Sequence, residues 1–201
     1  MKKAMGPAPR NPLHWAVALT ADQQVLHFVQ KEAYPINALT PRSWTAAHLA
    51  AREGNTKIMK TLLTAPGVDL KIKNEEGRTP LHLAALHNRV GAVKLLLQRD
   101  TRLLGVRDKR GRTAFLLAAQ KGHVKVLQAL KEHGQNFNEA SVSHGWTGLH
   151  LAAEEGQVEA VKFLVANGAK KDKETKGGAW KGSTAKQVAE RKGKLEVLQF
   201  L

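Results

Sequence analysis

The stretch GRTPLHLAAL, residues 77–86, decides the fold of this chain because altered copies of it return along the sequence. The copies begin at residues 11 (NPLHWAV), 45 (TAAHLAA), 79 (TPLHLAA), 113 (TAFLLAA) and 147 (TGLHLAA), and a degraded copy, TAKQVAE, begins at 184. The first five are 34 residues apart and the last interval is 37 residues. A fixed spacing predicts a tandem array. We therefore expect one array of six units over residues 11–201, preceded by a tail of residues 1–10.

The unit that begins at Thr79 predicts two short helices. Apolar residues recur at helical spacing in TPLHLAALHN, residues 79–88, and again in VGAVKLLLQR, residues 90–99. Thr79 stands where an N-cap is expected, and Pro80 suits the first helical turn because its missing N–H has no partner there. The small side chains of LAA let two helices approach closely. Each unit is therefore expected to be a helical hairpin.

The segments between the units carry the chemistry of tight turns. They read KIKNEEGR, LGVRDKRGR, ASVSHGW and KETKGGAWKGS, and each has a glycine two residues before the threonine of the next unit. Glycine supplies the positive backbone angle that such turns need. These segments are expected to project as turns or short hairpins, which we call fingers.

The residues of the units resemble ankyrin repeats. The resemblance rests on GRTPLHLAA followed by VGAVKLLL, and on GWTGLHLAAEEGQVEAVKFLVANGA at residues 145–169, and it covers residues 11–201. A period of 34 alone would suit tetratricopeptide repeats slightly better, but the Trp, Tyr and Pro pattern of that unit is missing. The resemblance implies an all-α solenoid, an L-shaped stack of hairpins with β-turn fingers and a concave surface that binds other proteins.

The two terminal units depart from the pattern. The first lacks the threonine, and the sixth lacks the Pro, Leu and His and follows a longer loop. Terminal repeats are expected to be atypical because one of their faces meets water, so we interpret both as caps. The sequence ends at LEVLQFL, within the second helix of unit six. It is either a short cap or the point where a larger protein was cut.

A histidine fills the same slot in four units, as His14, His48, His82 and His150, and Leu116 fills it in unit four. The resemblance implies that this histidine bonds to the threonine side of the turn and to neighbouring backbone. Four copies a full repeat apart cannot converge on one substrate or metal. The expected structural signature comprises Thr45, His48, Thr79, Pro80, His82, Thr113, Thr147 and His150.

No pattern in the sequence predicts catalysis. The chain has no cysteine, which excludes disulfides, thiolate metal sites and a cysteine nucleophile. The other histidines have no paired ligand spacing, and GGAWKGS is neither a phosphate-binding nor a dinucleotide-binding motif. We expect no enzyme activity, metal, cofactor or small-molecule substrate.

Function is expected in the positions that the repeat does not need. The residues immediately before the threonine slot, which we call the finger row, are Arg10, Trp44, Arg78, Arg112, Trp146 and Ser183. Register should place them along the finger bases and the concave face, and Trp and Arg are the residue types that most often carry interface energy. With their neighbours, the predicted partner-binding residues are Trp44, Arg52, Arg78, Lys109, Arg110, Arg112, Lys121, Trp146, Trp180 and Lys181. The preferred partner is an acidic protein segment with apolar anchors.

Three other interpretations stay open. The tryptophans alone could pack against adjacent fingers while the charges are solvated. Lys and Arg total 32 against 17 for Asp and Glu, a formal charge of +15, so binding of a polyanion or nucleic acid is the second alternative. Aromatic residues are sparse and no nucleic-acid motif is recognised, which favours a protein partner. An enzyme or effector domain beyond residue 201, with this array as its targeting module, is a further possibility.

The compartment is inferred from composition. A cysteine-free chain fits a reducing environment, so we expect a cytoplasmic or nuclear monomer. The first residues imitate a signal peptide, but prolines interrupt the apolar run and NPLHWAV is in register with the repeats. No apolar run approaches the roughly 20 residues of a membrane span.

Overall fold

The computed structural model describes residues 11–31 and 34–201 of the chain. The tail of residues 1–10, including Arg10 of the finger row and the start of the signal-like segment, lies outside the described residues. The described α-helices are α1 (Pro12–Ala18), α2 (Asp22–Gln30), α3 (Ala46–Glu53), α4 (Thr56–Thr64), α5 (Pro80–Leu86), α6 (Val90–Arg99), α7 (Ala114–Gln120), α8 (Val124–Glu132), α9 (Gly148–Glu155), α10 (Val158–Ala166), α11 (Ala185–Arg191) and α12 (Leu195–Leu198). Two short 3₁₀ helices, η1 (Thr101–Gly105) and η2 (Gly178–Trp180), lie in connecting segments.

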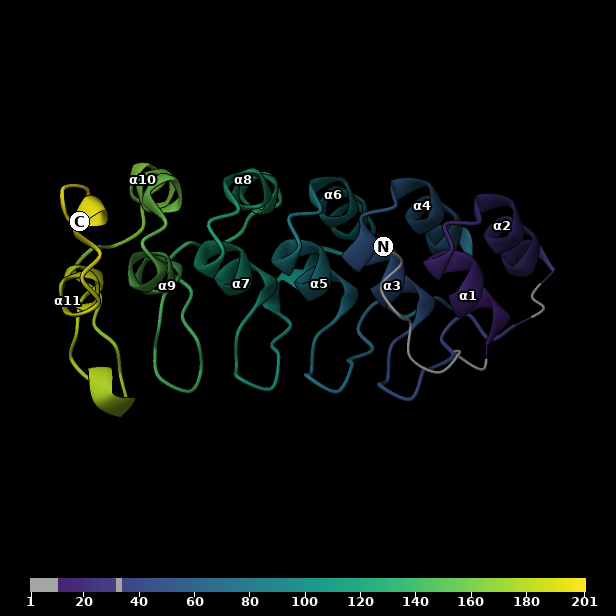
Figure 1. Cartoon of the computed structure of the whole chain (residues 1–201), viewed down its shortest axis with the longest axis horizontal. Helices are drawn as coiled ribbons and strands as arrows, with labels where there is room; N and C mark the ends of the chain where they lie inside the picture. Colours follow the sequence, from purple (N-terminus) through teal and green to yellow (C-terminus); the bar gives the residue numbers. More distant parts are fainter. Residues whose placement is uncertain (1–10, 32–33) are drawn as a thin grey trace, which may run out of the picture.

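These helices pair in chain order into hairpins that stand side by side along one axis (Figure 1). The odd-numbered helices form an inner layer and the even-numbered helices an outer layer, and the fingers leave the inner layer on one side (Figure 1). The described residues contain no strand, only an isolated antiparallel bridge between Ala140 and Thr147 in one finger. The predicted all-α stack with projecting fingers is confirmed.

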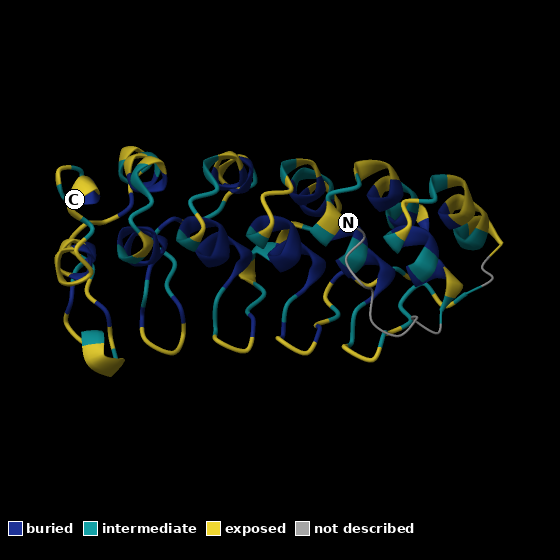
Figure 2. Cartoon of the chain, viewed as in Figure 1, coloured by how far each residue is buried: buried dark blue, intermediate teal, exposed yellow. Residues whose placement is uncertain are grey.

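A continuous apolar core runs between the two layers (Figure 2). Leucine and alanine of the inner helices, such as Leu81 and Ala84, are fully buried against the outer helices. Phe115 and Phe137 stack with their ring centroids 5.4 Å apart, and Phe163 meets the edge of Phe137 at 5.8 Å. Burial of each large apolar side chain stabilises the stack by about 1.5–3 kcal/mol, so the core fixes the spacing of the fingers.

The inner helices begin where the sequence predicts. Thr45 and Thr147 cap α3 and α9, and each forms a capping box with the histidine three residues later. Pro80 occupies the first turn of α5. In unit one, Asn11 replaces the threonine and its side chain accepts the N–H of Leu13 at 2.8 Å.

The fingers pack against one another through close backbone approaches. Gly77 has a φ of +75°, and a Cβ there would stand 2.7 Å from the backbone nitrogen of Lys109 in the next finger. That nitrogen donates to the carbonyl of Glu76 at 3.1 Å. Glycine permits both the left-handed backbone and the short distance between fingers.

The longest described helix, α6, has ten residues. None of the helices that the structure describes is both long enough and apolar enough to cross a membrane.

Candidate functional site

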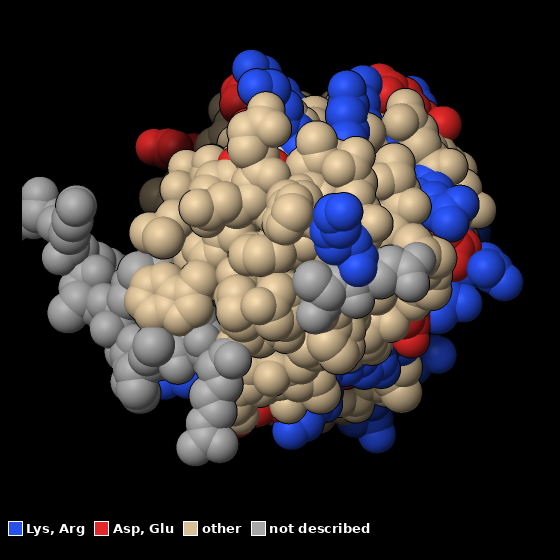
Figure 3. Space-filling view, turned by 90° about the vertical axis from the view of Figure 1, so that its right-hand side faces the viewer, with Lys and Arg blue, Asp and Glu red and all other residues tan. Residues whose placement is uncertain are grey.

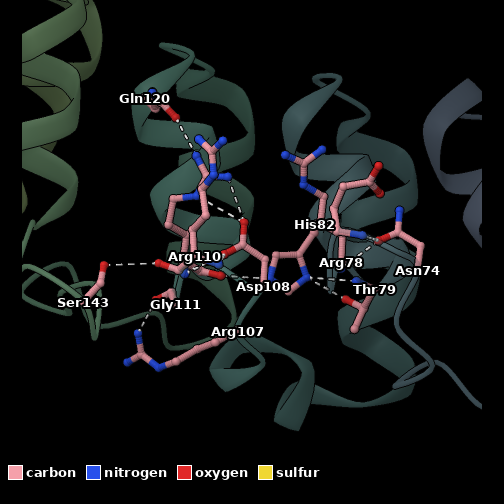
Figure 4. Close-up of polar contacts among 12 residues, drawn as sticks. Asn74, Arg78, Thr79, His82, Arg107, Asp108, Arg110, Gly111, Gln120 and Ser143 are labelled. Carbon is pink, nitrogen blue, oxygen red and sulfur yellow. Dashed lines mark hydrogen bonds and ion pairs between the residues drawn. The ribbon is translucent and has the colours of Figure 1, made fainter.

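The histidines that fill the same repeat position, His14, His48, His82 and His150, join their unit to the next. His82 Nδ1 accepts the backbone N–H of Thr79 at 3.2 Å and lies 2.8 Å from the Thr79 hydroxyl. Because Nδ1 is the acceptor, Nε2 carries the proton and donates to the carbonyl of Arg112 at 3.1 Å (Figure 4). His48 and His150 make the same set of bonds, to the carbonyls of Arg78 and Ser183 at 2.9 and 3.1 Å.

These imidazoles are neutral at pH 7. Burial lowers the pKa of His48 and of His82 to about 4, although their hydrogen bonds to backbone carbonyls favour the charged form. Burial also lowers the pKa of His14 and His150. A buried, neutral imidazole that is committed to two backbone partners has no free edge for a substrate.

Unit four lacks this connection because Leu116 fills the slot. The Thr113 hydroxyl is consequently buried with no hydrogen-bond partner among the described residues. The Trp146 carbonyl still accepts the N–H of Ser141 at 2.8 Å but receives no imidazole. In unit one, His14 donates to the Trp44 carbonyl at 3.0 Å, while its Nδ1 finds no partner within residues 11–31 and 34–201.

The finger row is partly accessible. Trp44, Arg78, Arg112 and Trp146 are each half-buried at the finger bases, whereas Ser183 is buried. Four of the six sequence-predicted positions therefore present side-chain surface on the finger side of the inner helices.

At the unit-two end of the row, a cation lies over an aromatic ring. The Arg52 guanidinium lies 5.0 Å from the centre of the Trp44 ring, and its Nε also donates to Glu53 at 2.7 Å. Trp44 packs beside His48, with ring centroids 6.1 Å apart. The predicted pair Trp44 and Arg52 therefore forms one surface.

At the other end, Trp146 and Trp180 meet edge to face with centroids 6.0 Å apart. Arg191 and Lys192 lie 5.6 and 5.5 Å from the Trp180 ring, and Lys192 pairs with Glu154 at 2.9 Å. Trp146 thus packs against the adjacent finger, as one interpretation of the sequence expects. It is also half-exposed, so part of its surface stays open to a partner. Lys181, after η2, is exposed.

The middle of the row borders a groove of about 570 Å³ between the fingers of units three and four. Cationic side chains outnumber anionic ones along its walls, and Leu86 and Leu117 are the apolar residues of its lining. Its charged lining residues are Glu75, Glu76, Arg78, Asp108, Lys109, Arg110, Arg112 and Lys121. The structure thus brings five of the predicted partner-binding residues to one groove.

Arg112 is held in this groove by its own finger. Its Nε and Nη2 donate to Asp108 Oδ2 at 3.1 and 2.9 Å, and its Nη1 donates to Gln120 at 3.2 Å (Figure 4). Burial of Asp108 opposes ionisation, but the backbone N–H and guanidinium of Arg112 outweigh it and lower the Asp108 pKa. The Asp108 side chain is only 1% exposed, so this ion pair is part of the structure of the finger.

Arg78 occupies the same place one finger earlier without such a partner. The residue that corresponds to Asp108 is Asn74, whose Oδ1 accepts the backbone N–H groups of Glu76 and Arg78 at 3.1 and 2.9 Å. Arg78 Nε and Asn74 Nδ2 are both buried, and neither has an acceptor in the part of the chain that the structure describes. Sequence reasoning selected Arg78 and missed Asn74, although the 34-residue register aligns Asn74 with Asp108.

A second groove, of about 210 Å³, continues the first toward unit five. Arg110 and Arg112 line both, and the far wall includes Trp146, Leu151 and Glu154. The two grooves together present cations near the apolar side chains of Trp146 and Leu151, with Glu154 on the same wall.

The end formed by unit one has a different character. Residues 11–31 carry only Asp22 and Lys31 as formal charges. Seen from that end, the visible face is largely free of charged side chains (Figure 3). In the same unit, Leu19 is 61% exposed. The predicted partner-binding cations therefore lie away from this end.

Known proteins share the sequence pattern and the fold. The family described as ankyrin repeats (3 copies) matches residues 13–104 and 101–175. The crystal structure of EF0377, an ankyrin repeat protein, has a TM-score of 0.82 and 25% identity over 94% of each chain. The ankyrin repeat domain of Bcl-3, a unique member of the IkappaB protein family, has a TM-score of 0.79 and 31% identity over 95% of this chain and 82% of that one. No curated protein sequence matches the chain.

Proposed function

Because the chain belongs to the ankyrin-repeat family, whose members generally act in protein–protein interaction, we propose that it is a non-catalytic scaffold for an acidic protein segment. The segment binds along the finger row, over the two grooves between units three, four and five. The observation that carries this proposal is the groove whose walls hold Arg78, Lys109 and Arg110, next to a second groove lined by Trp146 and Leu151.

The chemistry of the two grooves suits a segment that mixes carboxylates with apolar side chains. Guanidinium and ammonium groups form charge-assisted hydrogen bonds with carboxylates, and charge complementarity speeds association. The half-exposed faces of Trp44 and Trp146 supply apolar contact area. Since the core already fixes the finger spacing, little ordering entropy is lost on binding. We place this scaffold, as a monomer, in the cytoplasm or nucleus.

A polyanion is the second candidate, and one observation favours it. Exposed lysines follow α10 and surround the finger that carries Trp180, namely Lys170, Lys171, Lys176 and Lys181. Phosphate contacts with stacking on a tryptophan are the elements of single-stranded nucleic-acid binding. A targeting role for a longer protein is compatible with either candidate.

Capture from a lysate with and without nuclease separates the candidates. The test variant is Arg78→Glu with Arg110→Glu, because both residues line the groove and neither guanidinium has an ion-pair partner among the described residues. The matched control is Lys60→Glu with Lys125→Glu, which makes the same charge change on the exposed side of α4 and α8. We expect a nuclease-resistant protein that is lost only in the groove variant. Loss of all captured material on nuclease treatment of the wild type would contradict a protein partner.

A further inference from the structure

We propose that Arg78, which Asn74 leaves without a carboxylate partner inside the chain, is a receptor for a single carboxylate, supplied by an aspartate or glutamate side chain of the bound segment. This inference rests on the proposed function for the source of the carboxylate. The receptor is a specific position within the groove between units three and four, distinct from the general excess of positive charge around it.

The finger of unit four provides an internal template. Asp108 Oδ1 accepts the backbone N–H groups of Arg110 and Arg112, both at 2.9 Å, just as Asn74 Oδ1 accepts those of Glu76 and Arg78. The turn closes identically, by a backbone bond from Asp108 N to Arg112 O at 2.8 Å and from Asn74 N to Arg78 O at 2.9 Å. The bonds that close the two turns are therefore the same, and the difference at this residue is its other terminal atom, Nδ2 in Asn74 and Oδ2 in Asp108. The finger tips also differ, with Glu75 and Glu76 in place of Lys109 and Arg110.

That terminal atom determines whether the arginine side chain has a carboxylate partner within its own finger. In unit four it is the carboxylate oxygen Oδ2, which accepts two bonds from Arg112. In unit three it is an amide nitrogen, a donor, so it cannot accept a bond from Arg78. The consequence is two buried donors, Asn74 Nδ2 and Arg78 Nε, without acceptors among the described residues. These two atoms are closed to an external group, but Arg78 is only half-buried and lines the groove, so a carboxylate of a bound segment can reach its guanidinium from the groove side.

Reversal of the Asn74 amide does not solve this problem within the chain. It would turn the nitrogen toward the N–H groups of Glu76 and Arg78 and remove both bonds that hold the finger. A carboxylate partner for the Arg78 guanidinium must therefore come from outside this turn.

A carboxylate fits the receptor better than a dianion. A guanidinium pairs well with a planar carboxylate, and in the next finger Arg112 donates from Nε and Nη2 to one oxygen of Asp108, at 3.1 and 2.9 Å. Lys109, Arg110 and Lys121 line the same groove and attract an anion. Glu75 and Glu76, which are exposed in the same lining, oppose the second charge of a phosphoryl group. The receptor thus selects a singly charged planar group.

The direct test follows the Nε–H resonances of the arginines by NMR, using the full ¹⁵N-labelled chain and sodium acetate as the probe. Sodium chloride at equal ionic strength is the control, and Arg78→Lys assigns the resonance. We expect the Arg78 signal to shift saturably with acetate and not with chloride. An identical response to both salts would overturn the proposal.

Two reciprocal substitutions make the test specific. Asn74→Asp supplies the missing acceptor from within the chain, and we expect it to abolish the acetate response of Arg78 while the rest of the spectrum is kept. Asp108→Asn is the reciprocal variant, and its Arg112 signal is expected to become acetate-sensitive. A folded Asn74→Asp protein that responds like the wild type would contradict the receptor. Saturation by inorganic phosphate at lower concentration than acetate would overturn the choice of a carboxylate.

Failure of the receptor and failure of the proposed function give different results. The acetate titration needs no partner, so a negative result there removes the receptor while protein capture by the finger row can persist. If Asn74→Asp loses the acetate response but captures the partner as well as the wild type, the partner's carboxylate does not use this position.

Discussion

The imidazole of His82 links two units that are adjacent in space, because its Nε2 donates to the carbonyl of Arg112, 30 residues later in the chain, at 3.1 Å. The side chain of the same Arg112 lies in the proposed binding groove. Arg112 therefore takes part in both features. Its backbone carbonyl accepts the bond that joins two units, and its side chain lines the proposed binding groove.

Stability should fall in mild acid. His48 and His82 have a pKa of about 4 in the folded chain against 6.5 for the unfolded reference, so the unfolded state binds more protons between these values. The free energy of unfolding therefore has its full value above pH 6.5. It decreases as the pH falls from 6.5 to 4, by up to about 3 kcal/mol for each histidine. Urea unfolding at pH 7 and pH 4.5 measures this change. His82→Leu should show a smaller difference between the two conditions, and a pH-independent wild type would contradict the buried, neutral assignment.

Replacement of Thr113 by Val should stabilise the chain. The Thr113 hydroxyl is buried without a partner among the described residues, and it makes no side-chain cap bond to α7. Removing such a group while keeping its shape should raise the free energy of unfolding by about 1 kcal/mol. The matched variant is Thr147→Val, which loses the contacts to His150 and should cost about 1–2 kcal/mol. Equal effects from the two substitutions in a denaturant titration would be inconsistent with this difference between the units.

Gly77→Ala should destabilise more than Gly134→Ala. Both glycines have positive φ, but only at Gly77 would the added methyl meet backbone, at 2.7 Å from Lys109 N. We expect about 1 kcal/mol of backbone strain at either position and at least about 1 kcal/mol more at Gly77, where neighbouring fingers must separate. Thermal unfolding of the two variants makes the comparison. Similar melting temperatures would show that the fingers are not packed as described.

Asp108→Asn should cost about 2 kcal/mol, because it removes a hydrogen-bonded ion pair that is almost fully buried. Arg110→Gln, two residues away on the exposed finger tip, should change stability by less than about 0.5 kcal/mol. Chemical denaturation at pH 7 distinguishes them. Equal stability of Asp108→Asn and the wild type would mean that Arg112 does not depend on this carboxylate.

The repeat spacing was sufficient to predict the helices and fingers, since a 34-residue period aligns each Thr, His and Gly with its structural counterpart. It was not sufficient to predict which arginines of the finger row already have an ion-pair partner within the chain. Arg78 and Arg112 stand in equivalent positions, and their difference depends on one atom of Asn74 or Asp108 and on burial of that atom between fingers. The contact between Trp146 and Trp180 depends on the longer loop before unit six, in which η2 ends at Trp180.

Site-specific photocrosslinking tests the central claim most directly. A benzophenone amino acid placed at Lys109, exposed in the groove between units three and four, is compared with the same residue at Lys125, exposed on α8. After nuclease treatment of the lysate, the account predicts a cross-linked protein at position 109 and none at position 125. Cross-linking at position 125 alone would contradict binding on the finger row.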